Sequence, residues 1–231
     1  MLDPTGRVAM ISGASRGIGR AITERLLASG YSVSAGIRGT HTLAPHERLF
    51  VHRYDALSET DPVTWTAATM ARFGRIDALV NSAGINPRAK LDDTDETKID
   101  AMWQVNIKGP LRLIRAALPH LRAGGEGRVI NLASLSGKRV VNENVGYAMT
   151  KFALIALTHS LRREEWAHGI RATALCPGTV NTDMTLGISS APRDAITQPE
   201  DLAVLAETMI LLPNTATIGE LLVNYRQESF F

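Results

Sequence analysis

The chain has 231 residues, of which 45% are hydrophobic and 21% charged, a composition typical of one globular α/β domain. Its formal net charge of +2 argues against a nucleic-acid or membrane-surface partner. The single cysteine, Cys176, excludes an intramolecular disulfide and a cysteine-rich zinc site, and we expect no metal. No apolar run reaches the roughly 18 residues of a membrane span, and the first residues lack a leader pattern, so we expect a cytoplasmic protein.

Short apolar runs alternate with longer amphipathic ones along the chain. The short runs are mostly apolar throughout, which is typical of strands that are covered on both faces. The alternation predicts one doubly wound domain over residues 1–231, a Rossmann-type α/β fold with a parallel seven-stranded sheet and helices on both faces. The expected strands are residues 7–13, 31–38, 48–55, 75–84, 127–134, 170–178 and 219–224, and the expected helices are about 17–29, 61–73, 95–121, 147–168 and 199–211.

One connection differs from the others. Only the nine letters "GTHTLAPHE" (39–47) join the second and third expected strands, and Pro45 lies among them. That segment is too short for a full crossover helix. We therefore expect this edge of the sheet to be trimmed.

The first expected strand runs into the stretch "SGASRGIGR", which opens the first expected helix. Ligands bind at this place in open parallel sheets. Gly13 permits a tight turn, Gly17 lets the main chain approach a pyrophosphate, and Gly19 lets the helix pack on the strand. The spacing G-x-x-x-G-x-G differs from the G-x-G-x-x-G fingerprint, so a ligand-free turn stays open as an alternative at this point.

The charges near this loop favour one cofactor over another. NAD-binding folds carry an acidic residue some 20 positions after the loop, yet no Asp or Glu occurs between Glu24 and Glu47. The chain offers Arg38 at the end of the second strand and Arg16 within the loop. Guanidinium groups suit a ribose 2′-phosphate, which favours NADP(H) over NAD(H). The alternative is that both arginines are ordinary solvated side chains.

A candidate acid–base group lies at the start of the expected helix 147–168. Tyr147 and Lys151 are four positions apart and therefore share a helix face. A neighbouring ammonium favours the phenolate, so we expect Lys151 to lower the pKa of Tyr147 and make it a workable general acid–base. Ser134 closes the preceding strand at the same sheet edge and is placed to polarise a carbonyl. An incidental surface pair is the alternative when Tyr147 and Lys151 are considered alone.

Pro110 lies inside the expected helix 95–121. Because proline lacks an N–H, the carbonyl of Asn106 loses its helical partner. That carbonyl, or the Asn106 side-chain amide, is a candidate holder of an ordered water in a proton route. The alternative is a simple kink, which Gly109 also tolerates.

Taken together, these motifs resemble the single-domain branch of the short-chain dehydrogenase/reductase family, from about Arg7 to Asp201. The resemblance is carried by "SGASRGIG", "NSAG" (81–84), Ser134, "YAMTK" and "PGTVNTDM" (177–184). Ser12 stands where the family usually has Thr, and Ser82 replaces the second Asn of its Asn-Asn-Ala-Gly motif, so we expect slightly altered loop packing there. The end "LLVNYRQESFF" lacks the glycine-rich ending common in the family.

The resemblance implies a role for each matching residue. Tyr147 would give a proton to a carbonyl oxygen, Lys151 would bond the nicotinamide ribose, Ser134 would hold the carbonyl, and Asn106 would hold the relay water. Asp55 would contact the adenine, and Asn81, Ala83 and Gly84 would line the adenosine side. Thr182 would reach the carboxamide. The implied cofactor residues are Gly13, Ser15, Arg16, Gly17, Ile18, Gly19, Arg38, Asp55, Asn81, Ala83, Gly84, Tyr147, Lys151, Pro177, Gly178, Val180 and Thr182.

The expected function is NADP(H)-dependent hydride transfer with a carbonyl or secondary alcohol, as in a ketone or aldehyde reductase, with 3-oxoacyl compounds among the candidate substrates. An NAD-dependent alcohol dehydrogenase and a non-catalytic cofactor-binding regulatory protein are the alternatives. Segments 135–146 and 184–198 are expected to wall the substrate, the second as a mobile lid. The first carries Lys138, Arg139, Asn142, Glu143 and Asn144, which either contact a polar substrate or are solvated.

The apolar pattern of the expected helical segments 103–121 and 147–168 also predicts a homo-oligomer. The stretch "KFALIALTHSL" is apolar on more than one face, and one face already has to cover the sheet. We expect a homodimer or homotetramer through a four-helix contact, as in the family. Loops that cover the second face are the alternative.

Overall fold

The computed structural model describes residues 1–187 and 190–228. Its strands form a seven-stranded sheet in the order β3-β2-β1-β4-β5-β6-β7, and each neighbouring pair is parallel. The seven predicted strands are confirmed, with slightly narrower bounds. They are β1 (Val8–Ser12), β2 (Ser32–Ile37), β3 (Leu49–Arg53), β4 (Ala78–Asn81), β5 (Arg128–Leu132), β6 (Arg171–Pro177) and β7 (Glu220–Val223).

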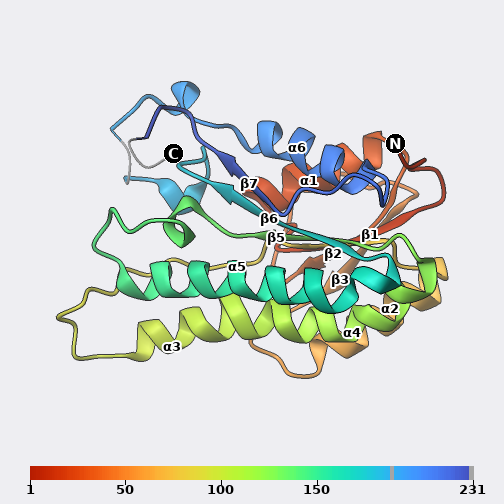
Figure 1. Ribbon diagram of the computed structural model, residues 1–231, viewed down its shortest axis with the longest axis horizontal. Coiled ribbons are helices and arrows are strands. Elements are labelled where there is room, and N and C mark those ends of the chain that lie inside the picture. The colour runs from red at the N-terminus through yellow and green to blue at the C-terminus, as the bar shows by residue number, and fades with distance from the viewer. Residues whose placement is uncertain (188–189, 229–231) are drawn as a thin grey trace.

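Helices cover both faces of this sheet (Figure 1). On one face α1 (Gly17–Ala28) and α6 (Pro199–Leu211) lie side by side. On the other face lie α2 (Asp61–Phe73), α4 (Gly109–Gly124) and α5 (Val145–Glu165), with α3 (Thr97–Trp103) against α5. The architecture is therefore the predicted Rossmann fold in a single domain. No helix in residues 1–187 and 190–228 is long and apolar enough to cross a membrane.

The single helix expected over 95–121 is interrupted. A π-helical turn, η1 (Gln104–Lys108), separates α3 from α4. The Gly109 N–H bonds the carbonyl of Gln104, five residues back. Because Pro110 cannot donate to the carbonyl of Asn106, the wider turn carries the helix past the proline. The structure therefore accommodates Pro110 with a π-turn rather than with a simple kink.

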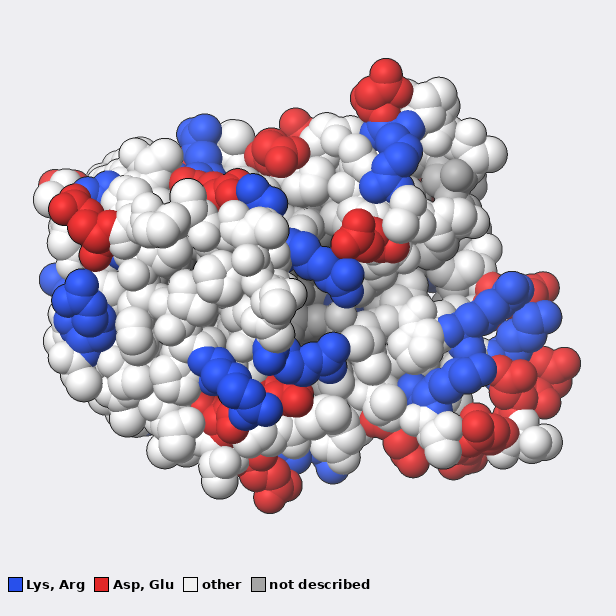
Figure 2. Space-filling model, turned by 180° about the vertical axis from the view of Figure 1, so that it is seen from behind, with Lys and Arg blue, Asp and Glu red and all other residues white. Residues whose placement is uncertain are grey.

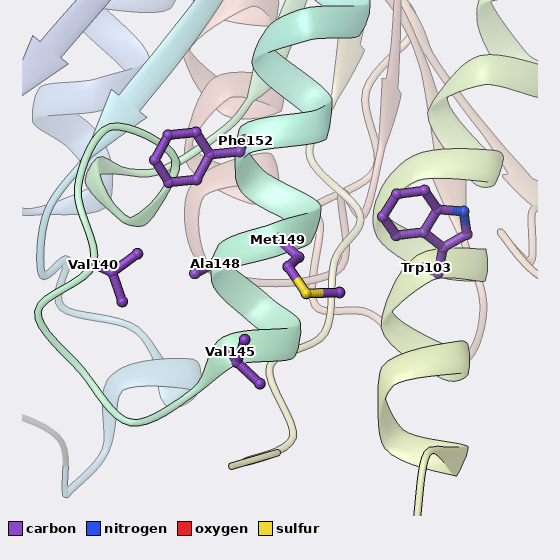
Figure 3. Close-up of a pocket in the computed structure, with 6 residues that line it drawn as sticks. All are labelled: Trp103, Val140, Val145, Ala148, Met149 and Phe152. Atoms are coloured by element: carbon purple, nitrogen blue, oxygen red, sulfur yellow. The ribbon is translucent and has the colours of Figure 1, made fainter. Parts of the chain in front are cut away.

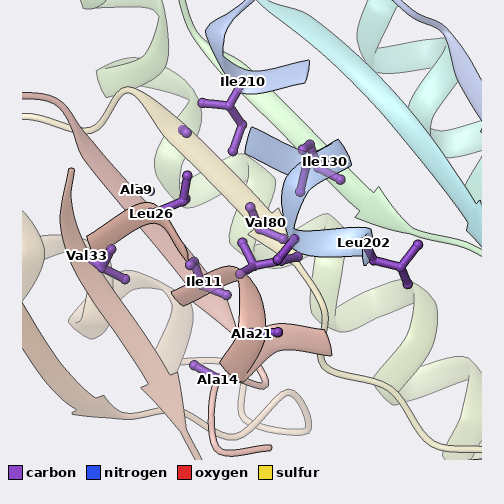
Figure 4. Packing of buried hydrophobic residues seen from close by; sticks show 14 of the residues in the cluster. Ala9, Ile11, Ala14, Ala21, Leu26, Val33, Val80, Ile130, Leu202 and Ile210 are labelled. Carbon is purple, nitrogen blue, oxygen red and sulfur yellow. The ribbon is translucent and has the colours of Figure 1, made fainter. Parts of the chain in front are cut away.

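The core lies on both faces of the sheet, which explains why the strands are apolar throughout. Figure 4 shows Ile11 and Val80 of the sheet facing Leu26 of α1 and Ile210 of α6. A second cluster fills the opposite face around Trp65 of α2, which is fully buried. These two layers fix the sheet between its helices.

The short link between β2 and β3 contains no helix or strand, as predicted. In the described chain its residues form turns and irregular backbone that is mostly exposed. Among the described strands, β3 is the edge strand and pairs with β2 alone. The space beyond the end of β2 therefore has no crossover helix over it, and it adjoins the glycine loop.

Candidate functional site

The glycine loop has the geometry that its three glycines predict. Gly13 and Gly17 adopt φ values of +68° and +54°, a region that favours glycine. A Cβ on Gly13 would lie 2.8 Å from the Cα of Ala83, and a Cβ on Gly19 would lie 2.3 Å from the carbonyl oxygen of Gly13. The loop is thus pressed against the end of β4, and only glycine fits at these positions.

The N-terminus of α1 opens onto this loop. Arg16 occupies the N-cap position without a side-chain capping bond, and the first turn, in this described part of the chain, holds no acidic residue. Main-chain amides at such an end bind anions, supported by the helix dipole. The loop and helix therefore fit a pyrophosphate, as the sequence indicated.

Ser12 performs a hydrogen-bonding role beside the loop. Its Oγ accepts from the amides of Ser82 and Ala83, at 3.1 and 3.2 Å. A serine hydroxyl thus ties β1 to the turn after β4. The substitution of Ser for the usual Thr leaves this tie in place.

A cleft of about 830 Å³ lies along the loop. Figure 2 shows the face of the molecule behind the view of Figure 1, which is hollowed near its middle with basic side chains on both sides of the hollow. Ten of the predicted cofactor residues line this cleft: Gly13, Ser15, Arg16, Gly17, Ile18, Arg38, Asp55, Ala83, Gly84 and Thr182. An elongated dinucleotide fits such a hollow, since the glycine loop forms part of its wall.

Other predicted cofactor residues take different places. The side chain of Asn81 is buried and donates to Asn131 Oδ1 at 2.8 Å, so it ties β4 to β5 rather than lining the cleft. Pro177 ends β6 and accepts from Ser134, Gly178 donates to Val223, and Val180 is buried beside Thr197. The expected adenosine contact of Asn81 therefore stays a prediction, although its Nδ2 is already engaged with Asn131.

Thr182 stands opposite the glycine loop. A Cβ on Gly17 would lie 3.2 Å from its methyl group, while its hydroxyl caps the short helix η4 (Asp183–Thr185). Asp55 also uses its carboxylate locally, where Oδ1 accepts from the amide of Leu57. Both residues line the cleft, but these contacts position backbone rather than reach into the hollow.

Arginines line the end of the cleft where β2 stops. Arg38 is exposed, and Arg16 forms an exposed ion pair with Asp183 at 3.1 Å. Arg20 lines the same cleft, and its Nη1 donates to Thr42 Oγ1 at 2.8 Å. Arg20 and Thr42 are cleft residues that were not predicted from the sequence. The position of Arg20, one turn after Arg16 on α1, is the signal that could have indicated it.

The expected catalytic residues come together at the carboxyl edge of the sheet. Ser134 follows β5 and hydrogen-bonds the Tyr147 phenol. Lys151 is buried, and its Nζ donates to the carbonyl of Leu132 at 2.7 Å. The same Nζ lies 5.4 Å from the centroid of the Tyr147 ring. A phenol, a hydroxyl and an amine thus share one small region of the site.

The expected lowering of the Tyr147 pKa is not found. Burial raises the pKa of Tyr147 to about 12, and the hydrogen bond from Ser134 offsets this only in part. Burial also lowers the pKa of Lys151 to about 8. The prediction was wrong because it counted the ammonium beside the phenol and left out the loss of solvent around both groups. The phenol is therefore held protonated near neutral pH and is suited to donate a proton.

Asn106 is fully engaged through its side chain. Its Nδ2 donates to the carbonyl of Ile85 and to Thr150 Oγ1, and its Oδ1 accepts from the amide of Ile85. The side-chain amide therefore holds the segment after β4 rather than a water. Of the two expected water-binding groups, only the main-chain carbonyl, to which Pro110 cannot donate, keeps that role as a prediction.

The charged side chains before α5 are paired within the protein. Lys138 pairs with Glu220, and Arg139 forms a two-point ion pair with Glu228. Glu143 pairs with both Arg88 and Lys90, at 2.8 and 3.2 Å. These contacts leave little charge in this loop for a substrate.

The remaining residues of the expected walls have mixed environments. Asn142 is exposed, which agrees with the alternative that this residue is solvated. Asn144 is buried and caps α5. The expected lid 184–198 is anchored near its end, where Gln198 Nε2 donates to the carbonyls of Arg193 and Ile196. Residues 188 and 189 of that segment lie outside the described residues.

The fold and this site are those of the dinucleotide-binding class of α/β proteins: a parallel sheet, a glycine loop on a helix N-terminus, and a Ser-Tyr-Lys group at the same edge. The sequence pattern described as "short chain dehydrogenase" matches residues 7–193. The chain belongs to the short-chain dehydrogenase/reductase family.

Individual relatives agree with this assignment. The chain is 40% identical over 228 residues to an agropine synthesis reductase of Rhizobium rhizogenes. The aligned region covers 96% of this chain and 53% of the relative. The chain thus spans about half the length of that curated relative. Among solved structures it resembles an alcohol dehydrogenase of Thermococcus sibiricus complexed with 5-hydroxy-NADP, with a TM-score of 0.85, 26% identity, and coverage of 97% of this chain and 99% of that one.

A second solved structure is equally similar. It is a 3-ketoacyl-(acyl-carrier-protein) reductase of Brucella melitensis complexed with NADH, with a TM-score of 0.86, 25% identity, and coverage of 96% and 98% of the two chains. The two structures hold different nicotinamide cofactors on the same fold. A nicotinamide cofactor is therefore the common property, while the choice between its two forms depends on each chain's own residues.

Proposed function

We propose that this protein is an NADP(H)-dependent reductase of ketones or aldehydes, with 3-oxoacyl compounds among the candidate substrates. The observation that carries the proposal is the meeting of Ser134, Tyr147 and Lys151 at the carboxyl edge of the sheet that also carries the glycine loop. A ligand-binding fold alone does not imply chemistry, but this group supplies an acid and a hydrogen-bond donor where ligands bind.

The roles follow from the chemistry of each side chain. When bound, the nicotinamide supplies the hydride that reaches the carbonyl carbon. Tyr147 gives its phenolic proton to the carbonyl oxygen, so that the product is an alcohol. Ser134 donates a hydrogen bond to that oxygen and orients it. Lys151 holds the ribose and, as an ammonium, stabilises the phenolate that Tyr147 leaves behind.

The basic residues of the cleft support NADP(H) over NAD(H). Arg38 and Arg16 line the end of the cleft next to β2, where a NAD-binding fold carries an acidic residue. Glu24 also lines this end, but its carboxylate is paired with Arg20 at 2.8 Å. The end of the cleft therefore favours a dianionic 2′-phosphate.

The test measures kcat/KM for NADPH and NADH with a panel of ketones and aldehydes. We expect wild type to prefer NADPH, and Arg38→Asp to shift the preference toward NADH by about 10- to 100-fold, since a charge-assisted bond is lost and a repulsion gained. Arg38→Lys keeps the charge and is the matched control, which should retain most of the NADPH preference. An unchanged preference in Arg38→Asp contradicts the cofactor proposal, and a wild-type preference for NAD⁺ with alcohols favours the dehydrogenase alternative.

Segment 184–198 is proposed as the substrate lid. It begins beside Thr182 and Asp183 at the cleft, and Arg193 Nη2 donates to the Thr182 carbonyl at 3.3 Å. Closure of such a segment excludes water from the reacting groups. In the chain it lies between β6 and α6, and its residues Met184 and Arg193 line the cleft.

The apolar surface of α3 and α5 supports a homodimer or homotetramer. Figure 3 shows a pocket of about 400 Å³ lined by Trp103, Val140, Val145, Ala148, Met149 and Phe152. Met149 and Phe152 are each 44% exposed on α5, a large exposure for apolar side chains on one helix face. Light scattering at micromolar concentration checks the proposal, and a monomer contradicts it.

A further inference from the structure

Asn144 is a buried polar residue that uses its whole side chain. It lies at the N-cap of α5, where its Oδ1 accepts from the amide of Tyr147 at 3.3 Å and from the amide of Ala89 at 3.2 Å. Its Nδ2 donates to Asn86 Oδ1 at 2.8 Å and to the carbonyl of Pro87 at 3.1 Å. A helix cap alone needs only the first of these four bonds.

The other three bonds join two separate parts of the chain. Residues 86–89 follow the turn after β4, whose residues 82–85 line the cleft. The near end of the same segment is held by Asn106, through both main-chain groups of Ile85. Asn144 holds the far end and connects it directly to the main chain of Tyr147.

We propose that Asn144 is a positioning residue, which fixes segment 85–90 against the first turn of α5 and so holds Tyr147 in register with the cleft. The inference rests on the proposed reductase function, because it assigns a consequence for proton transfer. A side chain that ties the phenol-bearing turn to the cleft wall controls the distance over which the proton moves.

The chemistry of the four bonds explains why an asparagine stands here. An aspartate accepts from Tyr147 and Ala89 but cannot donate to Asn86 or Pro87, and its charge would face their oxygens. A serine caps the helix and reaches less far. The two variants therefore keep the cap and remove the connection to segment 86–87.

A neighbouring contact supplies the control. Glu143 joins the same two segments through Arg88 and Lys90, but its side chain is 70% exposed and that of Arg88 is 67% exposed. Exposed ion pairs contribute little to structure. If the buried amide carries the positioning, Glu143→Gln should leave both structure and rate nearly unchanged.

The experiment compares wild type, Asn144→Asp, Asn144→Ser, Glu143→Gln and Tyr147→Phe. It measures amide hydrogen exchange of peptides covering 85–90, thermal unfolding, NADPH affinity by fluorescence, and kcat with the best carbonyl substrate. For both Asn144 variants we expect faster exchange in 85–90 and a kcat lowered about 10- to 100-fold, since a displacement of 1 Å can cost this much. NADPH affinity and the folded fraction should stay close to wild type.

The outcomes separate the inference from the function on which it rests. If wild type is active and Tyr147→Phe is not, a normal kcat or unchanged exchange in both Asn144 variants overturns the inference alone. A loss of kcat that only follows the loss of folded protein also overturns it, because the role is then structural. A wild type without turnover on any carbonyl overturns the proposed function and the positioning role together. Two folded variants that combine released 85–90 amides with low kcat support it.

Discussion

The glycine-loop half and the catalytic half of the site are built by different forces. The loop between β1 and α1 is shaped by close backbone approach, with Gly13 and Gly19 at distances that no side chain permits. The region around α5 is shaped by buried hydrogen bonds from Asn106, Asn144 and Lys151. The first half is therefore sensitive to added atoms, and the second is sensitive to lost polar groups.

The largest effect should come from the catalytic half. Tyr147→Phe keeps the ring and removes the only proposed proton donor, so turnover should fall by roughly 10²–10⁴-fold. NADPH binding should be nearly unchanged, because the loop half remains intact. Steady-state kinetics and a fluorescence titration measure the two quantities. Turnover near wild type would make Tyr147 a packing residue and remove the contrast between the halves.

The burial of the Lys151 amine should make the free energy of unfolding depend on pH. Its pKa is about 8 in the folded protein and near 10.5 in the unfolded chain, so the unfolded chain binds more protons between these values. The cost of burying this charge is fully present below pH 8 and disappears as pH rises through that window. The difference in unfolding free energy between Lys151→Met and wild type should therefore fall by up to about 3 kcal/mol from pH 8 to 10.5.

Denaturant unfolding at several pH values measures this slope. Tyr147 and Cys176 are present in both proteins, so their titration largely cancels in the difference. A difference that stays constant over the window would show that the Lys151 ammonium is not desolvated. Because the slope depends on the charge alone, it is separate from the lost hydrogen bond to Leu132.

The glycine loop should respond to an added methyl group. In Gly19→Ala the new Cβ meets the Gly13 carbonyl, and we expect the unfolding free energy to fall by about 1–3 kcal/mol, with weaker cofactor binding. Gly39→Ala is the matched control, because an added Cβ there meets no described atom within 4 Å. Thermal unfolding and cofactor titration check both variants. Equal behaviour of the two variants would show that close backbone approach does not shape the loop.

The sequence by itself determined the sheet and most of the helices, and it predicted ten residues that line the cleft. Uniformly apolar strands indicated a sheet covered on both faces, and the short 39–47 link indicated an edge without a helix. The spacing of Gly13, Gly17 and Gly19 indicated a tight turn between the first strand and the first helix. These features are local, so a local pattern is enough to predict them.

The tertiary structure alone decided what each polar side chain touches. The pKa of Tyr147 depends on burial by distant segments, which no i, i+4 spacing reveals. Asn81 on β4 hydrogen-bonds Asn131 on β5, and Arg20 on α1 hydrogen-bonds Thr42 in the link after β2. Asn144 hydrogen-bonds the carbonyl of Pro87, which lies far from it in the sequence. Hydrogen bonds and desolvation act over a few ångströms between residues far apart in the chain, so only the folded arrangement specifies them.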